Sequence, residues 1–124
     1  MEKTISVLIV EDERLIAMML RQMLEKGGFT VCGIAPNLSE ASRIIETQNP
    51  NFALIDIHLE NDDNGIELGK HLYNNKIAPF AYLTAYTDKD TYEEAMQTHP
   101  VAFLKKPVSL DTVKTIILEY YNHN

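Results

Sequence analysis

Polar residues able to support chemistry stand directly after short apolar runs of this sequence. Three are carboxylic acids (Glu11, Asp12 and Asp56), one is a hydroxyl (Thr84) and one is an amine (Lys106). The apolar runs before them span residues 4–10, 52–55, 79–83 and 101–104. Burying an ionised carboxylate is costly unless it is paired or binds a metal, so we expect Asp56 to face a crevice at the end of a buried strand.

Three carboxylates that share one crevice repel one another unless a cation offsets their charge. Oxygen ligands without clustered cysteine or histidine favour Mg²⁺ over Zn²⁺, and Mg²⁺ needs only one or two carboxylates together with waters and phosphate oxygens. Thr84 and Lys106 would complete a cradle for a phosphoryl group, with Asp56 as the nucleophile that forms an acyl phosphate. A simpler interpretation, in which the acids only cap loops and helices, stays open at this point.

The elements that must position these residues are five strands that alternate with five helices. Strands are predicted at residues 4–10, 29–34, 52–56, 79–84 and 101–104, because each is short and apolar. Apolar residues recur at helical spacing in the segments that follow them. The alternation predicts an α/β fold with a five-stranded parallel sheet and helices on both faces. Of the two common strand orders at this size, we expect the flavodoxin-like order 2-1-3-4-5.

The caps and buried faces of the helices are also predicted from the sequence. Ser39, Asp88 and Ser109 are expected to cap the second, fourth and fifth helices. The first helix should bury Leu15, Ile16, Met19, Leu20, Met23 and Leu24, and the fourth should bury Tyr92, Ala95 and Met96.

Length and composition set limits on the class of protein. A chain of 124 residues is expected to form a single domain over residues 1–124. The formal net charge of -7 argues against nucleic acid or an anionic membrane surface as a partner. Cys32 is the single cysteine, which favours a buried, inert thiol in a reducing compartment. Because no apolar run approaches the roughly 20 residues of a membrane span, we expect a cytoplasmic protein.

Four motifs carry a resemblance to a known family: LIVED at 8–12, ALID at 53–56, LTA at 83–85 and FLKKP at 103–107. With these motifs in this order and spacing, nearly the whole chain resembles the receiver domain of two-component response regulators. The resemblance implies a phosphorylation-controlled signalling switch, with a histidine kinase or phosphotransfer protein as partner. It also implies that the chain acts only on itself and is no enzyme for other substrates.

Matched position by position, the resemblance assigns a role to each site residue. Asp56 is implied as the phosphoacceptor, and Asp12 and Asp56 as direct ligands of Mg²⁺. Glu11 would act on the metal through water, and the main-chain carbonyl of His58 would be a further metal ligand. Lys106 would pair with a phosphoryl oxygen.

The resemblance also implies the moving parts of a switch. Thr84 matches the hydroxyl that turns toward the phosphoryl group, and Phe103 matches the aromatic residue that swings with it. Ala85 matches the small residue that leaves the site open, and the bond before Pro107 is expected to be cis. The face made by the fourth helix, fifth strand and fifth helix would change, and is a candidate homodimer surface.

The chain departs from the family pattern in two segments. Glu60 stands where many receivers have proline, and the loop from Asp56 to Gly65 is one residue longer than the commonest form, which puts its shape in doubt. His99-Pro100 replaces the usual Gly-Ala before the fifth strand.

Three alternatives remain. An aspartate-nucleophile phosphohydrolase would want a second Asp two residues after Asp56, where this chain has His58. A calcium loop over residues 60–71 would need a glutamate at its last position, which is His71. A receiver-like scaffold that takes no phosphate is disfavoured by the intact set of site residues.

Overall fold

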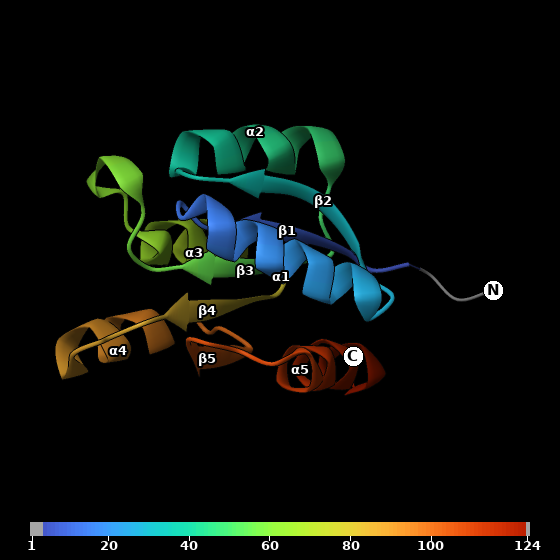
Figure 1. Ribbon diagram of the computed structural model, residues 1–124. Helices are drawn as coiled ribbons and strands as arrows, with labels where there is room; N and C mark the ends of the chain where they lie inside the picture. Colours follow the sequence, from blue (N-terminus) through green and yellow to red (C-terminus); the bar gives the residue numbers. More distant parts are fainter. Residues whose placement is uncertain (1–3, 124) are drawn as a thin grey trace.

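The computed structural model describes residues 4–123 and forms one parallel sheet (Figure 1). The strands are β1 (Ser6–Val10), β2 (Thr30–Ala35), β3 (Phe52–Asp56), β4 (Phe80–Thr84) and β5 (Ala102–Lys105). They lie in the order β2-β1-β3-β4-β5, and every neighbouring pair is parallel. The predicted α/β class and the flavodoxin-like strand order are therefore confirmed.

Five α-helices cover both faces of the sheet. They are α1 (Arg14–Lys26), α2 (Leu38–Gln48), α3 (Gly65–Asn74), α4 (Lys89–Met96) and α5 (Leu110–His123). Buried residues of α1 and α5 join one core cluster, and those of α2, α3 and α4 join the other. In Figure 1, α1 is seen in front of the sheet and α3 behind it. This two-layer burial explains why the central strands are apolar on both sides.

The central strands bring the polar residues of the sequence to one edge. All five residues of β3 and all five of β4 are buried, Asp56 and Thr84 included. In the sheet register Asp56 lies beside Leu83, and Thr84 lies beside Lys105. Because the strands are parallel, their carboxyl ends meet at the same edge, which is where open α/β sheets bind ligands.

The buried faces of α1 and α4 are narrower than predicted. Leu15 and Met19 of α1 are 74% and 61% exposed, while Ala17, Leu20 and Leu24 carry the burial. Tyr92 and Met96 of α4 are exposed as well, although the Tyr92 ring still packs against Phe103. A short helix that lies flat on a sheet buries one stripe, so apolar residues at the margins of that stripe stay in contact with solvent.

Helix capping agrees with the prediction at two of three positions. Asp88 Oδ1 accepts from Thr91 N at 2.7 Å, and Ser109 Oγ accepts from Thr112 N at 3.2 Å. The predicted cap at Ser39 is wrong, because α2 begins earlier and Asn37 Oδ1 accepts from Glu40 N at 2.9 Å. Asparagine in extended backbone caps as well as serine does, so residue type alone did not fix the boundary.

Several smaller expectations can be compared with the structure. The Lys106–Pro107 bond is cis, as predicted. Cys32 is half-buried rather than buried, and packs against the core cluster of α2, α3 and α4. The departure at His99 takes the form of a left-handed backbone with φ of 62°. Across residues 4–123, no helix combines the length and apolar character needed to cross a membrane.

Candidate functional site

Three acidic side chains meet at the carboxyl ends of β1 and β3. One carboxylate oxygen from each of Glu11, Asp12 and Asp56 lies within 4.8 Å of the others. β1 and β3 are paired, with Val10 beside Ile55, so the residues that follow them are held next to each other. Glu11 is fixed by its own backbone amide, which donates to the carbonyl of Ala35 at 2.9 Å. The sequence prediction that these acids crowd one crevice is confirmed.

Lys106 reaches across the sheet edge into this acidic group. Its Nζ donates to Glu11 Oε1 at 2.5 Å and to Asp56 Oδ2 at 2.9 Å. The lysine side chain is 14% exposed, and those of Glu11 and Asp56 are 0% and 9% exposed. Its backbone amide donates to the carbonyl of Thr84 at 2.8 Å, which extends the β4–β5 pairing and aims the side chain at the crevice.

Burial and pairing shift the ionisation of the crevice. Burial raises the pKa of Glu11 to about 7, although the hydrogen bond from Lys106 opposes that shift. Burial would lower the pKa of Lys106, but hydrogen bonds and charge from Asp56 and Glu11 outweigh it, so the pKa of the lysine is raised. The ammonium group is therefore the local cation that offsets the carboxylates.

The donor set fits a hard divalent cation. Asp12, Asp56, His58 and Lys106 line a cleft of about 260 Å³ together with Glu13, Ala85 and Tyr86. The carboxylates offer oxygen ligands in a wet crevice, which Mg²⁺ prefers, and one lysine opposite is suited to a phosphoryl oxygen. The amide of His58 donates to Asp56 Oδ1 at 3.1 Å, so the chain turns back over the aspartate and keeps residue 58 beside the acids.

Thr84 and Phe103 are the residues predicted to move, and they lie on β4 and β5. The buried Thr84 hydroxyl donates to the carbonyl of Tyr86 at 2.7 Å, so in this conformation it is committed to its own loop. The half-buried Phe103 ring lies between Tyr82 and Tyr92, with centroid distances of 6.2 and 4.9 Å. The strands β4 and β5 are paired, and Thr84 ends the strand next to the one that carries Asp56.

Gly65 has a role that its turn-forming character did not reveal. A β-carbon there would lie 2.2 Å from the carbonyl oxygen of Asp56, so any side chain would push the α3 helix off the β3 strand. Its amide also donates to the Ile57 carbonyl at 2.7 Å. A glycine directly before a helical pattern, nine residues after a buried aspartate, was the available signal.

Sequence reasoning missed the contacts that two acidic residues of the loop after Asp56 make with α2. Glu60 and Asp63 bond to the start of α2, at Asn37 and at the Leu38 amide. Residues Glu60–Asp62 form a short 3₁₀ turn in place of the predicted irregular loop. Glu60 would be the first ligand of the calcium loop considered at residues 60–71, and its carboxylate instead accepts a hydrogen bond from Asn37. No local sequence pattern signals contacts between residues so far apart.

Comparison with known proteins identifies the family to which the chain belongs. The model of the response regulator receiver domain matches residues 7–118. The transcriptional regulatory protein PdtaR of Mycobacterium tuberculosis is 36% identical over 104 residues, which are 84% of this chain and 50% of PdtaR. The chain thus spans about half the length of this curated relative.

Solved structures show the same fold. The signal receiver domain of a modulated diguanylate cyclase from Desulfovibrio desulfuricans G20 superposes with a TM-score of 0.88 at 36% identity, over 94% of this chain and 93% of that one. A response regulator from Burkholderia pseudomallei with a phosphorylated aspartic acid and a calcium ion gives 0.81 at 26% identity, over 90% and 65%. With the family model covering most of its length, this chain belongs to the response regulator receiver domain family.

Proposed function

We propose that this receiver is a phosphorylation-controlled switch that accepts a phosphoryl group on Asp56 from a histidine kinase or phosphotransfer protein. The observation that carries the proposal is the contact of Lys106 with both Asp56 and Glu11 at the open edge of the sheet. A structural ion pair would not need three carboxylates from two strands and a solvent-facing cleft beside them. The phosphorylated aspartic acid of the Burkholderia pseudomallei regulator supports the same chemistry here.

The transfer step follows from the groups present. A carboxylate oxygen of Asp56 attacks the phosphorus of a phosphohistidine, an O–P bond forms, and the P–N bond breaks. The bond electrons leave with the histidine ring, which takes up a proton from water. Lys106, already beside Asp56 Oδ2, stabilises the charge on the transferring oxygens. Water that enters the same cleft would later hydrolyse the acyl phosphate of Asp56.

Mg²⁺ is the proposed cofactor. Asp12 and Asp56 would bind it directly, Glu11 through water, and the carbonyl of His58 would add a neutral oxygen. When bound, the ion offsets the carboxylate charge and the charge of the incoming phosphoryl group.

The response to phosphorylation is proposed to start at Thr84. The phosphoryl group adds about two negative charges and three acceptor oxygens. The Thr84 hydroxyl can exchange the Tyr86 carbonyl for such an oxygen, and that exchange draws the loop after β4 inward. The buried Thr87 hydroxyl of that loop has no partner among the described residues, so the present hydrogen bonding leaves room for a better arrangement. Phe103 would bury further as Thr84 turns.

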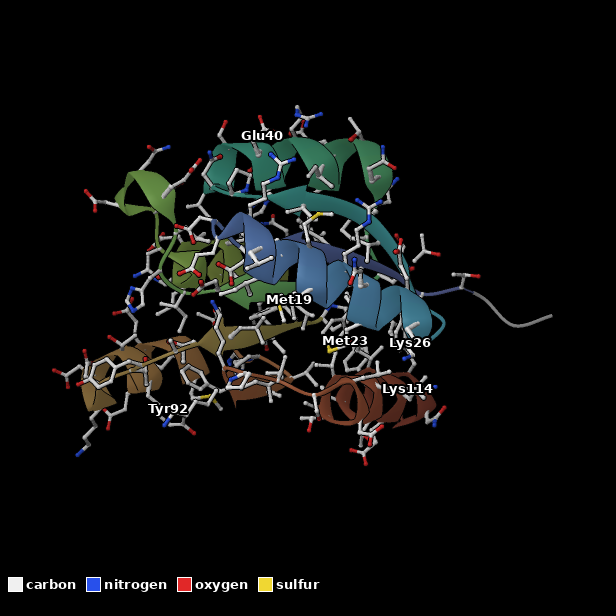
Figure 2. The ribbon with its side chains drawn as sticks, in the orientation of Figure 1. Met19, Met23, Lys26, Glu40, Tyr92 and Lys114 are labelled. Carbon is white, nitrogen blue, oxygen red and sulfur yellow. The ribbon has the colours of Figure 1, made fainter. Side chains whose placement is uncertain are left out.

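Two surfaces fit the proposed partners. The α1 helix begins at the cleft and exposes Leu15, Met18 and Met19, and Figure 2 shows Met19 and Met23 on the side of the helix that faces α5. A groove of about 270 Å³ between this helix and Pro107 also reaches Lys106. We propose this surface for the phosphodonor, since it adjoins the reacting carboxylate.

The face of α4, β5 and α5, with exposed Tyr92, would carry the output and a possible homodimer.

The proposed function also covers the class of partner, the location of the domain and the extent of its catalysis. The net charge of -7 supports a protein partner and argues against direct binding of nucleic acid or membrane by this domain. We also propose that the domain works in the cytoplasm, where its proposed partner would supply the phosphoryl group. The proposed catalysis is limited to transfer of a phosphoryl group to Asp56 and its hydrolysis from Asp56.

A titration with beryllofluoride and Mg²⁺, followed by NMR, tests this function. The phosphoryl analogue should shift the amide resonances of Thr84 and Phe103 in the wild-type chain and leave those of Asp56→Asn unchanged. Equal shifts in both proteins, or none in either, would contradict a switch controlled from Asp56 and favour a scaffold that takes no phosphate.

A further inference from the structure

The loop after Asp56 is fastened to the start of α2 by two side chains. Asn37 Nδ2 donates to Glu60 Oε1 at 2.8 Å, and the Leu38 amide donates to Asp63 Oδ2 at 2.9 Å. Leu38 is the first residue of α2, where a helical amide has no partner within its own helix. Asp63 therefore caps a helix to which it does not belong, and its charge faces the positive end of that helix. We call these two contacts the α2 clasp.

The fastened loop is closed by hydrogen bonds within itself. The Leu59 amide donates to the Asp63 carbonyl at 3.1 Å, and the Asp63 amide donates to the Glu60 carbonyl at 3.2 Å. His58 and Asn64 form a bridge across its base. Leu59 is buried, so it anchors the loop to the core. Asp63 thus closes the loop with its backbone and holds it to α2 with its side chain.

The other end of this unit lies at the acidic cleft. His58 is directly before Leu59, its amide bonds to Asp56 Oδ1, and the residue lines the cleft together with Asp12. In the proposed function its main-chain carbonyl is a ligand of Mg²⁺. That ion demands nearly ideal octahedral geometry, so a carbonyl on an unfastened loop would have to be ordered at the moment of binding.

We propose that Asp63 is a positioning residue for Mg²⁺, acting through the α2 clasp and the closed loop on the carbonyl of His58. The inference rests on the proposed function and extends it to a residue outside the acidic cleft. The inference also gives Glu60 a role. Many receivers have a conformationally stiff proline at this position, whereas here the Glu60 side chain holds the loop by its hydrogen bond with Asn37.

Mg²⁺ affinity of the full chain, measured by calorimetry or NMR titration, tests the inference. Asp63→Ala removes the contact to Leu38 and should weaken Mg²⁺ binding by about 10-fold, the effect typical of losing a partner that orients a metal ligand. Asp63→Asn keeps an oxygen that can accept from the Leu38 amide, and should stay within about 2-fold of wild type because only distant charge is lost. Glu60→Ala, at the exposed half of the clasp, should weaken binding by about 2- to 3-fold.

Two variants control for charge and for helix stability. Asp62→Asn removes the same charge from the neighbouring exposed residue, which is in left-handed backbone that asparagine tolerates. Glu40→Gln removes a charge from the first turn of α2, where its carboxylate pairs with Arg43 and, as Figure 2 shows, lies on the outer side of the helix. Both should bind Mg²⁺ as wild type does.

The possible results distinguish a failure of the proposed role of Asp63 from a failure of the proposed Mg²⁺ site. If wild type binds Mg²⁺ and both Asp63→Ala and Glu60→Ala bind it equally well, with only their melting temperatures lowered, Asp63 is merely structural and the inference fails alone. If wild type shows no Mg²⁺ binding, the proposed metal site fails and the inference falls with it. A loss in Asp62→Asn equal to that in Asp63→Ala would assign the effect to charge and overturn the positioning role.

Discussion

The hydroxyl of Thr84 donates to the carbonyl of Tyr86 at 2.7 Å, although Thr84 ends the strand next to the one that carries Asp56. The hydroxyl is therefore satisfied within its own loop before any phosphoryl group arrives. A switch built on this residue has to exchange one hydrogen bond for another, and a stronger acceptor is what drives the exchange.

Replacing Thr84 by alanine should separate phosphorylation from the response. Asp56, Asp12 and Lys106 keep their places, so the rate of phosphorylation by acetyl phosphate should stay within about 3-fold of wild type, a change of less than about 1 kcal/mol in the barrier. The beryllofluoride-induced shift of the Phe103 resonances should be lost, whereas Thr84→Ser, which keeps the hydroxyl, should retain it. A full Phe103 response in Thr84→Ala would refute the coupling.

Replacing Lys106 by methionine should destabilise the metal-free protein in a pH-dependent way. Burial raises the folded pKa of Glu11 from 4.5 to about 7 even with the lysine present, so the folded protein binds more protons than the unfolded chain between these values. Stability contributed by this group is therefore lost as pH rises through that window. Without Lys106 the pKa of Glu11 in the folded protein should rise further, so the loss of stability should continue to higher pH.

Thermal unfolding in EDTA at pH 5 and pH 8 measures this effect. Lys106→Met should cost about 1–3 kcal/mol at pH 8, because it leaves buried carboxylates without their cation, and clearly less at pH 5, where Glu11 is protonated. Lys105→Met is the matched control, since that neighbour is exposed and should change little. Equal losses at both pH values would show that packing rather than charge holds the lysine.

The buried hydroxyl of Tyr82 should contribute modestly to stability. It lies 2.5 Å from Thr98 Oγ1, which itself donates to the Ala95 carbonyl at 2.6 Å, so the tyrosine acts as the donor and ties β4 to the end of α4. Tyr82→Phe leaves the Thr98 donor satisfied, and should cost about 1 kcal/mol in urea unfolding. A cost above about 3 kcal/mol would mean that the whole helix end depends on this bond.

Much of the site was predictable because its residues end apolar runs. Asp56 and Thr84 are each the last residue of a strand that is buried on both faces. Because the carboxyl ends of parallel strands share one edge of the sheet, the polar residues that end these strands lie at the same edge. Alternation of strands and helices predicts that these strands are parallel, so their carboxyl ends share one edge. It does not choose between the two common strand orders, and the contact of Lys106 with Glu11 and Asp56 was not predicted.

The predictions that failed depended on geometry that the local sequence does not contain. Leu15 and Met19 repeat at helical spacing, but spacing does not say how wide a stripe the sheet will cover. Ser39 and Asn37 are both good caps, and the contact of Asp63 with Leu38 joins residues 25 positions apart across a loop of uncommon length. Such contacts are settled only when the whole fold is assembled.

The central claim is that Asp56 accepts a phosphoryl group in a Mg²⁺-dependent reaction, and intact mass tests it most directly. Wild type and Asp56→Asn are incubated with acetyl phosphate, with Mg²⁺ or with EDTA, and weighed at once. The account predicts a labile gain of about 80 Da, one phosphoryl group, in wild type with Mg²⁺ alone. The same gain in Asp56→Asn, or a gain in wild type that is indifferent to Mg²⁺, would contradict the site and its metal.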